Sequence, residues 1–335
     1  MLRSDTFASQ PPVSPTPQGG GSTPLWERAA PRPPSRRAVL GSLASGALVA
    51  SWPAQGASRL VVASKSDTEG ALTGAMIALA LESLGLTVVR RLGLGPTLIV
   101  RNALLAGEID VAPEYTGNGA FFTDTVSDPA WKSSAGAFET IRRADAARGL
   151  VWLARAPANN TWLIAVNGAL ARREGLATMT DFARAVTAGS IRLAASTEFV
   201  ESPAALPSFE AAYGFHLPLD RIVSLPGGDT AVTARAAAQG ISGINAGMVY
   251  GTDGALDALD LVVMEDPKGA QIVYEVAPVI RAEALARHPD IRPRLARIFT
   301  GLDAPTLRTL NARITVEGAV AEAVARAYLT ERGLL

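Results

Sequence analysis

The chain has 335 residues, of which 48% are apolar, and equal numbers of basic and acidic residues. This length and composition allow a large core and two lobes or domains, and they exclude a disordered chain. Residues 1–57 hold five Arg and two acidic residues, so the remainder carries 26 basic and 29 acidic residues. A nucleic-acid surface needs a clustered basic stripe, which this sequence lacks. We therefore expect a small molecule or a protein as the partner, and no nucleic acid.

The first 57 residues predict a disordered leader with an export signal. Eight prolines fall in the first 34 positions, and such a composition cannot form a packed core. Arg36 and Arg37 precede an apolar run at 38–50 and small residues at 54–58, an order that resembles a twin-arginine signal peptide. A membrane anchor is the alternative, but thirteen weakly apolar residues are too short to span about 30 Å. We expect export to the periplasm, without a lipid anchor because the chain has no cysteine.

From residue 59 onward, short apolar runs alternate with helical patterns. Strands are predicted at 59–64, 86–93, 109–115, 161–167, 191–196, 221–225, 243–250 and 260–265. Helices are predicted at 69–85, 96–108, near 179–187, 204–213 and 229–239, and throughout the region from about 281. This alternation is typical of parallel sheets covered by helices. We expect two α/β lobes, with the final helices packing on the first lobe.

Ligands of open α/β sheets bind beyond the carboxyl ends of the strands. The residues predicted at or near such ends are Ser64, Lys65, Ser66, Glu114, Tyr115, Thr116, Tyr250, Gly251, Thr252 and Tyr274. They include three of the five tyrosines, and Trp162 begins the first strand of the second lobe. A single aromatic residue at a strand end usually packs against its neighbours, but four that converge predict a binding site.

The segment "SKSDTEG" at 64–70 has two interpretations. Ser66 and Glu69 have the spacing of a capping box at a helix start. The same helix start, with its free N–H groups beside Lys65, could instead bind an electronegative group. The local sequence does not decide between them.

Catalytic motifs are missing from the sequence. His216 and His288 lie in loop-like surroundings and are not spaced as metal ligands, and no metalloprotease, nucleophile-elbow, P-loop or dinucleotide motif is present. Asp253, Glu265 and Asp266 could act as acid and base, but their surroundings are typical of turns. We therefore predict no enzyme, no metal and no cofactor.

Several stretches together resemble the substrate-binding proteins of glycine betaine, choline and related osmoprotectant ABC transporters, in the OsmF-like branch. They are "VVASKSDTEG", "RLGLGPTLIVRNALLAGEIDVAPEYTGN", "NNTWLIAV", "ASTEFVE", "LPSFEAAYGF", "VYGTDGALDALDLVVMEDPKGA" and "YEVAPVI", within residues 59–335. The resemblance implies a type II periplasmic binding protein, an α/β fold of two lobes joined by a two-strand hinge near 157–160 and 268–275. Lobe I would comprise 58–158 and 274–335, and lobe II 159–273.

The resemblance also implies a cage of aromatic rings around a quaternary ammonium group. The cage residues would be Tyr115, Trp162 (where relatives commonly have Tyr), Tyr250 and Tyr274. A quaternary ammonium cannot donate a hydrogen bond, so the face of an aromatic ring is its natural partner. Lys65 would help to bind the polar end of the ligand, and Asn118 would supply a hydrogen bond where relatives often carry Thr.

One departure from the family leaves the ligand open. Relatives usually carry an Arg that grips the ligand carboxylate in the turn where this sequence has Ser202, and a hydroxyl cannot replace that charged fork. Glycine betaine, choline, carnitine, ergothioneine or another cationic or amino-acid-like solute remain candidates. The implied partner is an ABC permease in the membrane, with the binding protein acting as a monomer. The alternatives are an exported enzyme on the same scaffold and a sensory domain.

Overall fold

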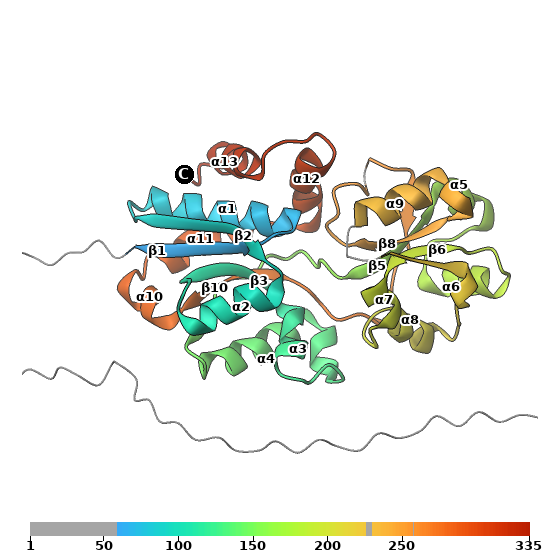
Figure 1. Ribbon diagram of the computed structural model, residues 1–335, viewed down its shortest axis with the longest axis horizontal. Coiled ribbons are helices and arrows are strands. Elements are labelled where there is room, and N and C mark those ends of the chain that lie inside the picture. The colour runs from blue at the N-terminus through green and yellow to red at the C-terminus, as the bar shows by residue number, and fades with distance from the viewer. Residues whose placement is uncertain (1–58, 226–229, 257) are drawn as a thin grey trace, which may run out of the picture. The chain divides into compact units, whose positions relative to one another are not determined.

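The computed structural model describes residues 59–225, 230–256 and 258–335. The leader and export signal predicted for residues 1–57 lie outside the described residues. Within the described part, ten strands form two five-stranded sheets (Figure 1), with the orders β2-β1-β3-β10-β4 and β7-β6-β8-β5-β9. We call each sheet with its helices a lobe: α1–α4 and α10–α13 belong to the first, and α5–α9 to the second.

The strands follow the predicted ranges to within a few residues. Those of the first sheet are β1 (Leu60–Lys65), β2 (Val88–Gly95), β3 (Val111–Tyr115), β4 (Leu150–Trp152) and β10 (Val276–Arg281). Those of the second sheet are β5 (Trp162–Asn167), β6 (Leu193–Ser196), β7 (Ile222–Leu225), β8 (Ala246–Tyr250) and β9 (Leu261–Val263). β4 and β10 were not among the predicted strands: the three residues of β4 are too few to show a period of two, and β10 runs up to residue 281, where a helical region was predicted to begin.

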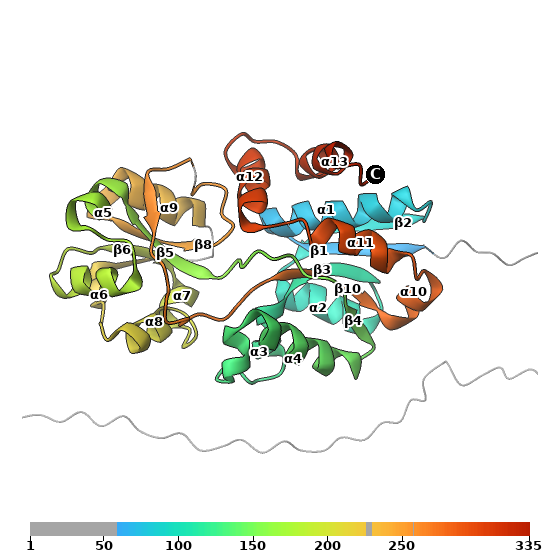
Figure 2. The ribbon, with the colours of Figure 1, turned by 180° about the vertical axis from the view of Figure 1, so that it is seen from behind.

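Helices cover both faces of the first sheet. They are α1 (Thr68–Ser83), α2 (Thr97–Ala106), α3 (Gly119–Phe122), α4 (Ser134–Ala146), α10 (Ala282–Arg287), α11 (Ile291–Phe299), α12 (Ala304–Thr315) and α13 (Ala321–Glu331). The side chains of α1 share one core with β1, β3 and the carboxyl-terminal helices, whereas α2 and α4 form a second core on the opposite face. Figure 2 shows α11, α12 and α13 on the same side as α1. Enclosed by the sheet and these helices, α1 is buried over most of its length.

The second sheet is also covered on two faces. Its helices are α5 (Gly168–Glu174), α6 (Met179–Thr187), α7 (Thr197–Glu201), α8 (Leu206–Tyr213) and α9 (Thr230–Gln239). Residues of α5, α6, α7 and α8 share the larger core with one face of the sheet. Alanines of α9 pack on the other face.

Both sheets are mixed, so the prediction of parallel sheets needs a correction. β1 runs parallel to β2 and β3, but β10 runs antiparallel to β3, with Val276 opposite Tyr115. In the second sheet β6 runs parallel to β7 and β8, but β5 runs antiparallel to β8, with Trp162 opposite Tyr250. The reason is connectivity: β5 and β10 each follow a segment that arrives from the other sheet, so no crossover helix forces them to be parallel.

A buried ion pair joins α2 to α4 in the first lobe. Arg101 donates from both terminal nitrogens to Asp145, at 2.6 and 2.5 Å, and Trp152 donates from Nε1 to the same carboxylate at 2.7 Å. Both charged side chains are almost completely buried. All the hydrogen bonds are charge-assisted, so the pair is well compensated for its loss of water.

Replacing Asp145 with Ala should lower the free energy of unfolding by about 3–5 kcal/mol, because Arg101 would remain buried without its counter-charge. Urea denaturation of the mature protein measures this change. The matched control is Glu139→Ala on the same helix, where Glu139 pairs with Arg142 in solvent and its loss should have little effect. Equal stability of the Asp145→Ala variant and the wild type would contradict the prediction.

Candidate functional site

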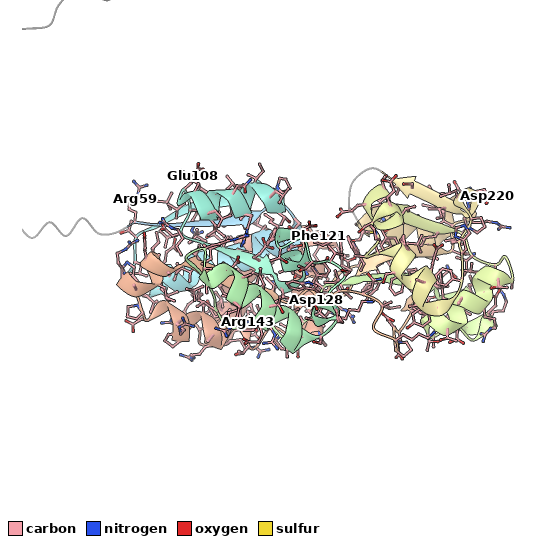
Figure 3. The ribbon with its side chains drawn as sticks, turned by 90° about the horizontal axis from the view of Figure 1, so that it is seen from below. Arg59, Glu108, Phe121, Asp128, Arg143 and Asp220 are labelled. Carbon is pink, nitrogen blue, oxygen red and sulfur yellow. The ribbon has the colours of Figure 1, made fainter. Side chains whose placement is uncertain are left out.

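A cavity of about 970 Å³ is lined by residues of both lobes, at the sheet edges where β1, β3 and β8 end. Six of the seven predicted site residues line it: Lys65, Tyr115, Asn118, Trp162, Tyr250 and Tyr274. Leu98 and Phe121 also line it while remaining 63% and 46% exposed, and Figure 3 shows Phe121 at the surface of the first lobe. The structure therefore brings the predicted aromatic residues together around one space; that they hold a ligand stays a prediction.

The four aromatic residues reach this edge from strands of opposite direction. Tyr115 and Tyr250 are the last residues of β3 and β8, whereas Trp162 is the first residue of β5 and Tyr274 precedes β10. An antiparallel strand brings its amino end to the edge at which its neighbour ends. The rings of Trp162 and Tyr274 consequently meet across the two lobes, with centroids 6.1 Å apart and planes inclined by 59°.

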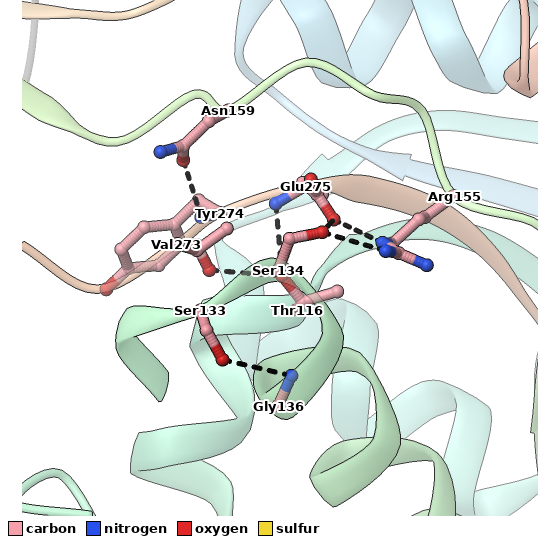
Figure 4. A network of polar contacts seen from close by, with 9 residues as sticks. All are labelled: Thr116, Ser133, Ser134, Gly136, Arg155, Asn159, Val273, Tyr274 and Glu275. Carbon is pink, nitrogen blue, oxygen red and sulfur yellow. Dashed lines mark hydrogen bonds and ion pairs between the residues drawn. The ribbon is translucent and has the colours of Figure 1, made fainter. Parts of the chain in front are cut away.

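Backbone hydrogen bonds hold Tyr274, and its ring packs closely against Gly117, which has no side chain. Its N–H donates to Oδ1 of Asn159 at 2.8 Å (Figure 4). Its carbonyl accepts from the N–H of Asn160 at 2.8 Å. A Cβ atom added to Gly117 would lie 2.7 Å from the Tyr274 ring. Glycine at 117 is therefore required by close approach, which explains its place after Tyr115.

The segment that carries Tyr274 is tied to the first lobe on both sides of the ring. Thr116 donates from Oγ1 to the carbonyl of Val273 and accepts from the N–H of Glu275, both at 3.1 Å. The Glu275 carboxylate accepts from Oγ of Ser134 at 2.9 Å and forms an ion pair with Arg155 (Figure 4). These bonds fix the direction in which Tyr274 enters the cavity.

Glu69 is the site residue that sequence reasoning missed. Its carboxylate is buried and accepts from the Tyr115 hydroxyl at 2.7 Å, from Thr252 Oγ1 at 2.5 Å and from Asn311 Nδ2 at 2.8 Å. Burial raises the pKa of Glu69, and the three hydrogen bonds oppose that rise. Burial, followed by the nearby Glu69 carboxylate, raises the pKa of Tyr115 well above its usual value. The carboxylate thus joins α1 to the turn after β8 and to α12.

The capping-box interpretation of Ser66 and Glu69 is wrong. The residue that caps α1 is Asp67, which accepts from the N–H of Gly70 at 2.7 Å. Glu69 turns inward instead, because three donors offer hydrogen bonds that a solvated capping position lacks. The spacing of residues in this polar segment does not indicate that Glu69 is buried.

Lys65 lies against the aromatic wall. Its Nζ is 4.2 Å from the centroid of the Tyr115 ring, a cation–π contact. Buried Glu114 lies near it and accepts through Oε1 from the Tyr115 N–H at 2.8 Å. The same oxygen accepts from Nδ2 of Asn118 at 2.7 Å, so the Asn118 amide is hydrogen-bonded to the protein. Within residues 59–225, 230–256 and 258–335, Oε2 of Glu114 has no hydrogen-bond partner. Burial raises the pKa of Glu114, and the Lys65 charge acts in the opposite direction.

Trp162 and Tyr250 form the wall from the second lobe. Burial raises the pKa of Tyr250 to about 12, and the nearby indole N–H of Trp162 moderates that rise. The same N–H is buried and, as far as the chain is described, lies outside normal hydrogen-bond geometry with any acceptor. Phe199 supports the indole from behind, with ring centroids 6.2 Å apart and an edge-on arrangement. Phe199 therefore restricts the orientation of the indole.

Ser202 does not line the cavity. It ends α7, and its N–H donates to the carbonyl of Glu198 at 2.9 Å. A role for Ser202 in ligand binding stays a prediction.

The remaining polar candidates of the sequence have structural partners. His216 lies on the surface 3.2 Å from Glu210, and Asp266 accepts from the Tyr213 hydroxyl at 2.5 Å. Asp253 accepts from the N–H of Tyr250 at 2.7 Å. No group of three His, Cys, Asp or Glu suited to a metal ion occurs among the residues described. Nor does any helix in the described ranges have the length and apolar character needed to span a membrane.

Glu69 gives the structure a testable pH dependence. Because its folded-state pKa is raised above 4.5, the folded protein holds this proton more tightly than the unfolded chain. The stability contributed by Glu69 is therefore greatest below pH 4.5 and falls as the pH rises through the raised pKa. In urea denaturation at a series of pH values, the difference in unfolding free energy between wild type and Glu69→Gln should decrease with rising pH.

The matched control is Glu139→Gln. Hydrogen bonding to Arg142 lowers the pKa of Glu139, so the corresponding difference should rise with pH and be small because this pair is exposed. If the Glu69→Gln difference stayed constant or rose with pH, the assignment of a raised pKa to Glu69 would be wrong.

Comparisons with known proteins agree with this architecture. Residues 58–331 match the family described as the substrate-binding domain of ABC-type glycine betaine transport systems. The glycine betaine-binding protein YehZ of Escherichia coli K12 is 49% identical over 295 residues, covering 88% of this chain and 96% of that protein. The glycine-betaine-binding protein of Pseudomonas aeruginosa PAO1 is 32% identical over 300 residues, covering 88% and 94%.

The solved structure of apo YehZ from E. coli superposes with a TM-score of 0.72 at 48% identity, covering 83% of this chain and all of that one. The predicted fold class, an α/β periplasmic binding protein of two lobes, is thereby confirmed. These relatives are named as binding proteins of transporters, so the chain is a binding protein and not an enzyme. It belongs to the family of substrate-binding domains of ABC-type glycine betaine transport systems.

Proposed function

We propose that this protein captures a quaternary ammonium osmoprotectant, such as glycine betaine or choline, between its two lobes and delivers it to an ABC permease. The observation that carries the proposal is the meeting of Tyr115, Trp162, Tyr250 and Tyr274 around one cavity. Two of these residues come from the edge of each sheet. The names of the two curated relatives, both glycine betaine-binding proteins, point to the same class of ligand.

The chemistry of the ligand matches these walls. A trimethylammonium group carries a positive charge that it cannot use in a hydrogen bond, whereas an aromatic ring presents a negative face. A desolvated contact of this kind contributes about 2 kcal/mol, so several rings together suffice for a useful affinity. Tyrosine hydroxyls with raised pKa values remain neutral at physiological pH, which keeps the rings free of local negative charge.

Capture follows from the division of the rings between the lobes. A ligand that touches Tyr115 and Tyr274 as well as Trp162 and Tyr250 stabilises conformations in which both pairs reach it. The segments that connect the lobes pair with each other at Asn159 and Glu275. We place the hinge there, with lobe I at 58–158 and 274–335 and lobe II at 159–273.

The proposed setting is the periplasm. The twin-arginine pair Arg36 and Arg37 would direct export, and the mature protein would act as a monomer that presents its liganded form to the permease. Lys65 and Asn118 would support the polar part of the site through their contacts with Tyr115 and Glu114.

Replacing Trp162 or Tyr250 with Ala should weaken binding of a quaternary ammonium compound by at least about tenfold, since each change removes one aromatic wall. Isothermal titration calorimetry of the mature protein with glycine betaine and with choline measures this effect. Tyr250→Phe is the matched control: it keeps the ring and should keep the affinity within about threefold. If the affinity survived both Ala changes in folded protein, the cage assignment would be wrong.

A further inference from the structure

The charged side chains around the cavity are mostly acidic. Among the described lining residues the only basic side chain is Lys65, whereas four are carboxylates: Asp67, Glu69, Glu198 and Asp253. A zwitterionic ligand needs a site for its own carboxylate, and the strongest such sites are Lys65, a helix amino end or an Arg. The first two of these are present, and their surroundings decide whether they are free.

Lys65 is already engaged by the protein. Its ammonium lies over the Tyr115 ring at 4.2 Å and acts electrostatically on buried Glu114. To hold a ligand carboxylate it would have to leave an aromatic face and uncover a carboxylate that has one buried oxygen without a partner in the described chain. An anionic ligand group therefore competes with groups of the protein for this single charge.

The amino end of α1 is similarly occupied. Asp67 caps it through the N–H of Gly70, and Glu69 lies in its first turn. The Asp67 carboxylate opposes the attraction of this helix end for an anion. Ser202 lies outside the cavity lining. Lys65 and the amino end of α1 are thus both engaged by groups of the protein.

Glu198 provides a reason for the cavity to prefer a cation that has no carboxylate. It belongs to α7, lines the cavity and is exposed. Its negative charge contributes to the raised pKa values of Tyr250 and Tyr274, so the carboxylate acts on the two rings that face the cavity from either lobe. No Lys or Arg in the described ranges forms an ion pair with it. A cation held by these rings would gain the attraction of Glu198, and a ligand carboxylate would be repelled.

We propose that the cavity selects a quaternary ammonium cation without a carboxylate, an alcohol of the choline type, and that Glu198 is a specificity-determining residue. The proposal rests on the proposed function, since it assumes that the aromatic walls hold the ammonium group. Choline and glycine betaine test it directly, because they share the trimethylammonium group and differ in carrying a hydroxyl or a carboxylate. Their affinity ratio therefore isolates the polar end of the site.

The experiment is calorimetry with both ligands on the wild type, Glu198→Gln and Glu201→Gln. Glu201 is the matched control, because it lies on the same short helix, is exposed and does not line the cavity. Wild-type protein should bind choline about tenfold more tightly than glycine betaine. Glu198→Gln should weaken choline about two- to fivefold, leave glycine betaine unchanged or tighter, and reduce the salt dependence of choline binding. Glu201→Gln should match the wild type with both ligands.

Each contrary outcome would overturn a different claim. Glycine betaine binding as tightly as choline would overturn the selectivity proposal and leave the proposed function standing. Equal effects of Glu198→Gln and Glu201→Gln would show that only the net charge matters, which would overturn the role of Glu198. Failure of the folded wild type to bind either compound would overturn the proposed function itself.

Discussion

The aromatic lining of the cavity depends on the antiparallel pairing of one strand in each sheet. β10 lies against β3 and β5 lies against β8, so the start of one strand meets the end of the other at a common edge. The same strands continue from the two segments that connect the lobes, and those segments bridge each other at Asn159 and Glu275. The same two strands therefore both connect the lobes and bring the aromatic residues together. A change in the direction of either strand would separate Tyr274 from Tyr115, or Trp162 from Tyr250.

Beneath the aromatic walls lies a layer of buried polar groups that sets their electrostatics. Glu69 holds the hydroxyl of Tyr115 and, through Thr252 and Asn311, ties the turn after β8 to the first lobe. Glu114 lies behind the same tyrosine. Buried carboxylates are costly unless they are compensated, and here hydrogen bonds and Lys65 provide the compensation. The hydrogen bonds of Glu69 and Glu114 support the tyrosine wall from behind.

The sequence predicted the strands and helices that have a regular hydrophobic pattern, and the residues that lie at strand ends. Alternating strands and helices predicted both sheets, and the positions of Tyr115, Trp162 and Tyr250 followed from where strands end or begin. The direction of β5 and β10 could not be predicted, since hydrophobic pattern does not encode whether neighbours run parallel. Glu69 has the spacing of a capping box in the sequence, and its buried role could not be predicted because its hydrogen-bond donors come from residues up to 242 positions away. Glu198 resembled an ordinary exposed helix residue, and only the lining of the cavity distinguishes it from Glu201.

The position of Lys65 over Tyr115 has a consequence for how tightly any solute can be held. The protein supplies an ammonium group of its own to one aromatic face of the cavity. A ligand cation at this face would have to displace Lys65. Its affinity would then reflect the difference between its own contact with the Tyr115 ring and the contact that Lys65 loses. Under the proposed function, Lys65 would return to the ring when the solute leaves, which favours release over retention.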